Sequence, residues 1–248
     1  MVRLDRNHNG YGGTNGDNNA GMHRLVAGIH EFQSNVFQSQ RELFENLAGG
    51  QRPGGLFITC SDSRINPNLI TQTDPGELFI LRNVGNIVPP FSPTTADGGA
   101  SAAIEFAVTA LDVEYIVICG HSHCGAMKGL LHPEDLTEMP SVSAWLGNAE
   151  SARRIVRTNY TGLSEEDQMS VMIQENVLVQ LENLRTHPAV AVRLAPRGDL
   201  RLYGWVYKIE TGEVFAYSAD EGQFVSLSDM PAALTQTAAT NYASMRAI

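Results

Sequence analysis

Three short apolar runs constrain the fold of this chain more than any other feature of the sequence. They span 56–60, 78–81 and 115–119. Runs that are apolar throughout and only four or five residues long are typical of buried strands in a parallel sheet. Between the second and third run, the small-residue stretch 98–108 has helical spacing. Strand, helix and strand in this order favour right-handed crossovers, so the sequence predicts an α/β fold with a mainly parallel central sheet flanked by helices.

The remaining pattern predicts one domain between two less structured ends. Apolar residues recur at helical spacing through 22–47, which predicts an N-terminal helical arm. Further helices are expected at 141–157 and 165–185, and a hairpin or two late strands at 200–209 and 214–217. We assign 22–227 to this domain, residues 1–21, rich in Gly and Asn, to a flexible N-terminal arm, and the weakly patterned 228–248 to a C-terminal tail.

Charge and composition exclude several classes of partner and location. Lys and Arg total 17 against 27 Asp and Glu, a formal net charge of −10, which argues against nucleic acid or an anionic membrane as the main partner but not against a small anion. No apolar run approaches the roughly 18 residues of a membrane span, and the N-terminus lacks the apolar core of a secretory signal. An odd count of 3 cysteines favours a reducing compartment. We therefore expect a cytoplasmic protein, or one in a compartment within the cytoplasm.

Two chemically unusual segments follow the first and third apolar runs directly. They are Cys60-Ser61-Asp62-Ser63-Arg64 and His121-Ser122-His123-Cys124-Gly125. The carboxyl ends of parallel strands share one edge of a sheet, where α/β folds place their sites. Two thiolates and an imidazole suit Zn²⁺, and the two residues between His121 and Cys124 let one turn present both. The sequence thus predicts a zinc site formed by Cys60, His121 and Cys124.

Three protein ligands leave a fourth position open, as in catalytic rather than structural zinc sites, unless Asp62 fills it. Arg64 is placed to pair with Asp62 through a bidentate contact that keeps the carboxylate ionised. His123 is next to Cys124 and is expected to point away from the metal.

Each element alone has a simpler structural explanation. A lone cysteine at a strand end is more often a buried small hydrophobe, and Cys119, inside the third run, keeps that interpretation. An Asp-Ser-Arg loop is usually a turn with a surface ion pair. A thiol phosphatase would need five residues between its cysteine and arginine, whereas Cys60 and Arg64 have three between them. Only the joint occurrence of both segments at neighbouring strand ends favours a metal site.

These segments, with PGELFILRNVGNIVPPF at 75–91 and GGASAAIEFAV at 98–108, resemble the β-class carbonic anhydrases. The similarity continues through ENVLVQLENLRTHPAV at 175–190 and GDLRLYGWVYKIETGEV at 198–214, and it is strongest to the plant and cyanobacterial branch, which includes carboxysomal enzymes. The resemblance implies zinc on Cys60, His121 and Cys124, Asp62 and Arg64 as a paired dyad, and reversible hydration of CO₂ to bicarbonate. It also implies a homodimer or a higher oligomer of dimers.

The resemblance further implies a substrate pocket near the metal. Gln51, nine residues before Cys60, matches the glutamine of plant-type members, and Phe79 and Val84 match pocket residues, with Gly125 expected beside them. The bicarbonate-locked bacterial branch has a tryptophan where this chain has Phe57, so we expect water rather than Asp62 in the fourth position.

One position departs from the plant-type pattern. Fifteen residues before His121, where the plant-type pocket has a tyrosine, this chain has Phe106. A hydroxyl near the substrate is therefore missing, unless Phe106 is a core residue facing away from the metal.

Two alternative functions stay open at this point. One is a carbon disulfide or carbonyl sulfide hydrolase on the same fold. The other is a weakly active component that binds carboxysome proteins. Tyr160 and His123 are candidates for passing the product proton to buffer.

Overall fold

The computed structural model describes residues 19–93, 98–194 and 198–229. The chain divides into two compact units, Met1–Gln51 and Arg52–Ile248. Most of the arm predicted over 1–21 and of the tail predicted over 228–248 lies outside the described residues, and the boundaries of the domain at 22–227 stay a prediction.

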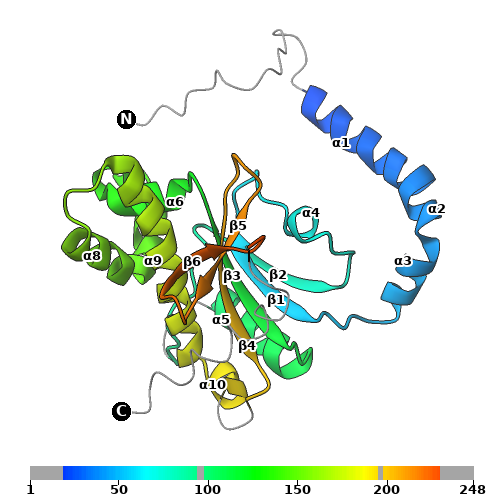
Figure 1. Cartoon of the computed structure of the whole chain (residues 1–248). Helices are drawn as coiled ribbons and strands as arrows, with labels where there is room; N and C mark the ends of the chain where they lie inside the picture. Colours follow the sequence, from blue (N-terminus) through cyan, green and yellow to red (C-terminus); the bar gives the residue numbers. More distant parts are fainter. Residues whose placement is uncertain (1–18, 94–97, 195–197, 230–248) are drawn as a thin grey trace. The chain divides into compact units, whose positions relative to one another are not determined.

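The described part of the N-terminal unit is helical, as predicted for 22–47 (Figure 1). Helix α1 (Ala20–Glu31) continues through a π-helical turn (Phe32–Val36) into α2 (Phe37–Ser39), and α3 (Arg41–Ala48) follows. The rings of Phe32, Phe37 and Phe44 contact one another, with centroids 5.2–6.2 Å apart. Two glycines follow, and Gly50 has φ +146°, a conformation that other residues avoid.

The second unit is built on a six-stranded sheet in the order β2-β1-β3-β4-β5-β6. The first four of these strands are parallel and the last two pairings are antiparallel, which confirms the mainly parallel sheet. The strands are β1 (Gly55–Cys60), β2 (Leu78–Asn83), β3 (Tyr115–His121), β4 (Arg201–Tyr207), β5 (Val214–Ser218) and β6 (Gln223–Ser226). The sequence did not predict β6, because four residues with a polar residue at each end carry too little periodicity.

Helices flank this sheet (Figure 1). They are α4 (Pro67–Thr71), α5 (Gly98–Glu105) with a π-helical continuation (Phe106–Ala110), α6 (Gly125–Leu131), α7 (Pro140–Leu146), α8 (Glu150–Asn159), α9 (Glu165–Thr186) and α10 (Pro188–Leu194). Short 3-10 turns cover Pro133–Leu136 and Gly147–Ala149. The second of these interrupts the single helix predicted over 141–157, so that prediction was wrong at Gly147.

Helix α9 approaches the sheet closely because two strand residues have no side chain. A Cβ added at Gly204 of β4 would lie 2.8 Å from Val177 Cγ1, and one added at Gly120 of β3 would lie 3.0 Å from Val177 Cγ2. Both distances are shorter than ordinary contacts, so Val177 fits over the two glycines and fixes the position of α9 on β3 and β4.

Apolar side chains fill the space between the sheet and these helices. Leu56, Ile58, Ile116 and Ile118 from the central strands are fully buried, with Val177 and Leu184 of α9 packed on the same side. Phe57, Val117 and Cys119 come next to them in sequence and face the other side of the sheet, where they lie in a second cluster with aromatic residues of β4. No helix among the described residues is long and apolar enough to cross a membrane.

Candidate metal centre

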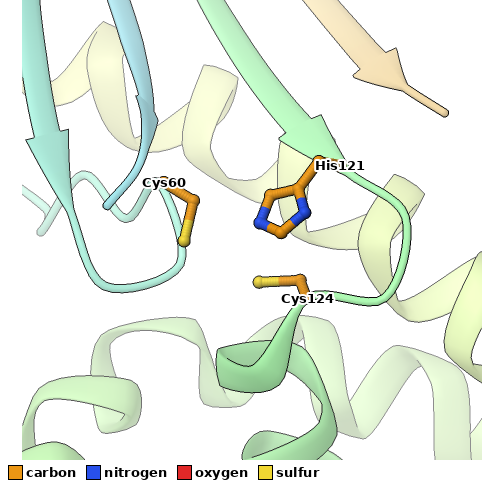
Figure 2. Close-up of side chains that lie close together, drawn as sticks. All are labelled: Cys60, His121 and Cys124. Atoms are coloured by element: carbon orange, nitrogen blue, oxygen red, sulfur yellow. The ribbon is translucent and has the colours of Figure 1, made fainter. Parts of the chain in front are cut away.

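The predicted zinc ligands converge at one edge of the sheet. Cys60 is the last residue of β1, His121 is the last of β3, and these two strands are parallel neighbours. Cys124 precedes the first residue of α6. Figure 2 shows the two sulfur atoms and the imidazole ring turned toward one another.

The turn that joins His121 to Cys124 explains how one short segment presents two ligands. His123 has φ +55°, in the left-handed region that non-glycine residues seldom occupy. This conformation reverses the chain, so that Cys124 faces back toward the end of β3. Ser122 Oγ donates to Glu210 Oε2 at 2.6 Å and accepts from the Ile209 amide at 2.9 Å, which ties the turn to the β4–β5 connection.

The donor atoms have the spacing and chemistry of a metal site. One ligand atom from each of Cys60, His121 and Cys124 lies within 4.8 Å of the others, and all three residues are buried. Among the described residues, these three are the cluster of His, Cys, Asp or Glu side chains that could hold an ion. Two thiolates and one imidazole are a ligand set that Zn²⁺ prefers.

The hydrogen bonding of His121 provides a test of fit. Its Nδ1 lies 2.9 Å from the Ser122 carbonyl oxygen and donates to it, so Nε2 carries the free lone pair. His121 is fully buried, and within the described part of the chain its Nε2 has no hydrogen-bond partner. A buried acceptor without a partner costs about 1–3 kcal/mol, which a metal ion would remove. The residues present therefore fit zinc.

The two thiols differ in acidity. Hydrogen bonding from Cys124, opposed by burial and helped by the Gly85 amide, lowers the pKa of Cys60 well below its usual range. The same pairing and burial raise the pKa of Cys124. The Gly85 N–H donates to Cys60 Sγ at 3.3 Å.

Cys119 behaves differently from both. It is buried inside β3, and burial raises the pKa of its thiol to about 12. It has no place in the ligand cluster, which confirms that this cysteine packs as a small apolar residue.

Asp62 and Arg64 form the predicted pair. Arg64 Nε donates to Asp62 Oδ1 at 2.9 Å, Arg64 Nη2 to Oδ2 at 2.7 Å, and the Arg64 amide to Oδ1 at 3.0 Å. These bonds from Arg64 lower the pKa of Asp62 to about 2, against a smaller effect of burial. Asp62 Oδ2 lies 3.9 Å from His121 Nε2, too far for a hydrogen bond. The carboxylate is thus ionised and lies beside the ligand cluster.

The five predicted pocket residues lie in different environments. The rings of Phe79 and Phe106 contact each other, with centroids 5.9 Å apart, and Phe106 is 47% exposed. Val84 is also exposed, and its carbonyl accepts from Trp145 Nε1 at 2.8 Å. Gly125 opens α6, and a Cβ there would meet nothing within 4 Å. Gln51 belongs to the N-terminal unit, so its part in the pocket stays a prediction.

The two residues considered for proton transfer both pair with glutamates. His123 Nε2 lies 3.5 Å from Glu210 Oε2 on the surface, and the Tyr160 hydroxyl donates to Glu175 Oε1 at 2.9 Å, which raises the pKa of Tyr160. Their role in proton transfer stays a prediction.

Sequence reasoning missed several residues that hold the site. Arg82, near the end of β2, donates to the Cys60 carbonyl at 3.1 Å and to the Asp62 carbonyl at 2.7 Å. The signal in the sequence that could have identified Arg82 was a single arginine near the end of an apolar strand. The amides of Asn176, Gln180 and Asn183 in α9 bond the segment after β2, and their spacing of four and three residues marks one helix face.

Comparison with known proteins agrees with this geometry. Residues 55–214 match the family model described as carbonic anhydrase. A carbonic anhydrase of Synechocystis sp. is 52% identical over 206 residues, covering 83% of this chain and 74% of that protein. One from Synechococcus elongatus is 49% identical over 214 residues, covering 86% and 78%.

Solved structures are similar as well. The structure of the β-carbonic anhydrase CcaA has a TM-score of 0.80 at 52% identity, and covers 83% of this chain and 92% of its own. A tetrameric β-carbonic anhydrase of Sordaria macrospora has a TM-score of 0.70 at 31% identity, with coverage of 79% and 96%.

Proposed function

Since this chain belongs to the β class of carbonic anhydrases, we propose which of its side chains carry out the hydration of CO₂ that this membership establishes. The reaction joins one water oxygen to the carbon of CO₂ and releases one proton, giving bicarbonate. Its site is the cluster of Cys60, His121 and Cys124, which is typical of zinc in this class. Zinc held there supplies a Lewis acid that brings the pKa of a water molecule toward about 7.

Asp62 is the acceptor that orients the attacking water. The observation that carries this role is its position, because Oδ2 lies 3.9 Å from His121 Nε2 while Arg64 holds both carboxylate oxygens. A carboxylate with a pKa near 2 accepts hydrogen bonds and does not donate them at neutral pH. Asp62 can therefore hold a water hydrogen and leave an oxygen lone pair free for the carbon of CO₂.

Arg64 keeps Asp62 in this role and out of direct ligation. Its guanidinium satisfies both oxygens and also donates from Nη2 to the His123 carbonyl at 3.1 Å, within the turn that carries two ligands. Moving Asp62 onto a metal would break at least one of these charge-assisted bonds. We therefore expect an open fourth position at neutral pH.

CO₂ is small and apolar and needs an apolar surface beside the ligands. Phe79 and Phe106 contribute two rings that contact each other. Val84 lies in the loop after β2, and Gly125 is the first residue of α6, directly after the ligand Cys124. The amide of Gln51 would orient a substrate oxygen. These assignments rest on the sequence resemblance together with the contact between the two rings.

The working form is a homodimer or a larger assembly of dimers. Beta-class relatives include tetramers, and helix α1 supports assembly here because its apolar residues are not buried by the described residues of its own unit, 19–51. We place the protein in the cytoplasm, with a carboxysome and its proteins as a further partner, because the similar relatives include cyanobacterial enzymes.

The test is the turnover of purified protein with measured zinc content. We expect about one zinc per chain and CO₂ hydration proportional to it in stopped-flow assays. Carbonyl sulfide and carbon disulfide, assayed on the same preparation, should react far more slowly. Faster turnover of either sulfur compound, or bound zinc without CO₂ hydration, would overturn the proposed roles.

A further inference from the structure

Three side-chain amides on one face of α9 bond a single stretch of backbone. Asn176, Gln180 and Asn183 follow one another at helical spacing, and all of them reach the segment 85–91, which follows β2. These partners are more than 90 residues away in sequence. We call these three residues the amide ladder.

The ladder is continuous and each rung has a partner. Asn176 Nδ2 donates to the Gly85 carbonyl at 3.1 Å, and Gln180 Nε2 donates to Asn176 Oδ1 at 2.8 Å. Gln180 Oε1 accepts from the Val88 amide at 2.8 Å, and Asn183 Nδ2 donates to the Val88 carbonyl at 2.8 Å. Asn176 and Gln180 are buried, so these bonds are protected from competition by water.

The helix that carries the ladder is fixed to the sheet. Val177, next to Asn176, sits over Gly120 and Gly204 with no room for a further carbon atom. Gly120 directly precedes the ligand His121 in β3. The position of Asn176 is therefore set by the same strand that sets the imidazole.

The segment held by the ladder touches the metal centre at Gly85. Its N–H donates to Cys60 Sγ at 3.3 Å, while its C=O accepts from Asn176. Gly85 has φ +84°, and a Cβ there would lie 3.0 Å from that of Ala126 in the helix that follows Cys124. One glycine thus lies against the Cys60 sulfur, the helix that follows Cys124 and the ladder.

We propose that Asn176 and Gln180 are positioning residues for the zinc site, which fix the Gly85 amide so that its hydrogen stays directed at the Cys60 sulfur. A hydrogen bond to a thiolate withdraws electron density from sulfur, so it sets how strongly Cys60 donates to the metal. The proposal rests on the zinc assignment made above.

Cobalt substitution measures this effect directly. Asn176→Leu keeps the volume of the side chain and removes the donor to Gly85. In the Co²⁺-loaded full-length protein, the thiolate-to-metal charge-transfer band should move to lower energy than in the wild type. Zinc affinity, measured by competition with a chelator, should fall by roughly 10- to 100-fold, because the Gly85 amide no longer holds the Cys60 sulfur in its orientation.

Thr186→Val is the matched control. Thr186 lies at the far end of α9, and its Oγ1 accepts from the Phe91 amide at 2.8 Å, so this variant also removes one bond between the helix and the same segment. We expect an unchanged charge-transfer band and unchanged zinc affinity, whatever its melting temperature. If Asn176→Leu does not fold, Gln180→Met removes the bonds to Asn176 and Val88 and should shift the band in the same direction.

An unshifted band in the folded ladder variant, or an equal shift in Thr186→Val, would overturn the proposal. A wild-type protein that binds neither Co²⁺ nor Zn²⁺ would instead refute the zinc assignment, so the two failures are distinguishable.

Discussion

The metal-site edge of the sheet and helix α1 of the N-terminal unit both contain groups that lack a partner among the described residues, but these groups differ in chemistry. At the edge, Cys60, His121 and Cys124 are at most 6% exposed, and the atom without a protein partner is a nitrogen, His121 Nε2. In α1, the uncovered groups are apolar: Leu25 is 63% exposed and Ile29 is 54% exposed.

The difference teaches that metal binding and assembly are separable in this molecule. All three metal ligands come from one chain and one unit, so an ion completes the site without a second copy. The apolar face of α1 is not buried by the part of its own unit that the structure describes, and burial of such side chains is the main favourable term in association. Changes in one region should therefore leave the other property intact.

The largest expected effect is at the ligands. Cys60→Ser and Cys124→Ser should each lose zinc and CO₂ hydration together, by more than the roughly 10- to 100-fold that loss of an outer partner costs, because serine is not deprotonated at neutral pH. Metal analysis and stopped-flow assays on the same samples check this. Cys119→Ala should keep its metal, and full zinc with undiminished turnover in Cys60→Ser would refute the ligand set.

The next effect is on assembly. The double variant Leu25→Glu with Ile29→Glu should weaken self-association by about 2–4 kcal/mol, or roughly 30- to 1,000-fold, from the loss of two partly exposed apolar side chains. Sedimentation velocity over a concentration series measures it, with zinc content expected to stay the same.

The control adds the same charge on the opposite face of α1. Ala20→Glu with Ala27→Glu should leave the assembly unchanged, since these positions lie about half a turn from Leu25. Dissociation in the control, or an unaltered assembly in the first variant, would show that this face is not an interface.

A smaller effect is expected at the dyad. Asp62→Asn should keep its zinc but lower kcat by roughly 10- to 100-fold, because an amide can donate to the attacking water where the carboxylate only accepts. Activity per zinc separates this from metal loss. A variant that lost its zinc at pH 8 would identify Asp62 as a fourth ligand instead.

The smallest effect is at Phe106. Since this ring is 47% exposed and contacts Phe79, an added hydroxyl should not be buried without a partner, and Phe106→Tyr should keep its melting temperature. If the hydroxyl reaches the substrate pocket, a hydrogen bond of about 0.5–1.5 kcal/mol would raise the hydration rate by roughly three- to twelvefold. An unchanged rate per zinc would remove Phe106 from the pocket.

The sequence predicted what depends on local pattern. The apolar runs that became β1 and β3 are buried as predicted, whereas β2 is an edge strand whose apolar residues are only half-buried. The ligand set is recognisable because Cys60 and His121 end neighbouring strands. The pairing of Asp62 with Arg64 spans two residues, so it too was accessible from spacing.

What escaped prediction depends on contacts between distant segments. Gly85 donates to a sulfur 25 residues away, and its carbonyl accepts from Asn176, 91 residues along the chain. Single amides in a helix carry no sign of their partners, and the break at Gly147 between α7 and α8 interrupts a pattern that continues on both sides. Such features follow from tertiary packing, which propensity and periodicity do not contain.

X-ray absorption at the zinc edge of the purified wild-type protein tests the central claim most directly. Ligation by Cys60, His121 and Cys124 predicts two sulfur atoms at about 2.3 Å and lighter atoms, including an imidazole nitrogen, at about 2.0–2.1 Å. The same spectrum is expected from Cys119→Ala. A first shell with no sulfur, or with three sulfur atoms in the wild type and two in Cys119→Ala, would contradict the site described for this chain.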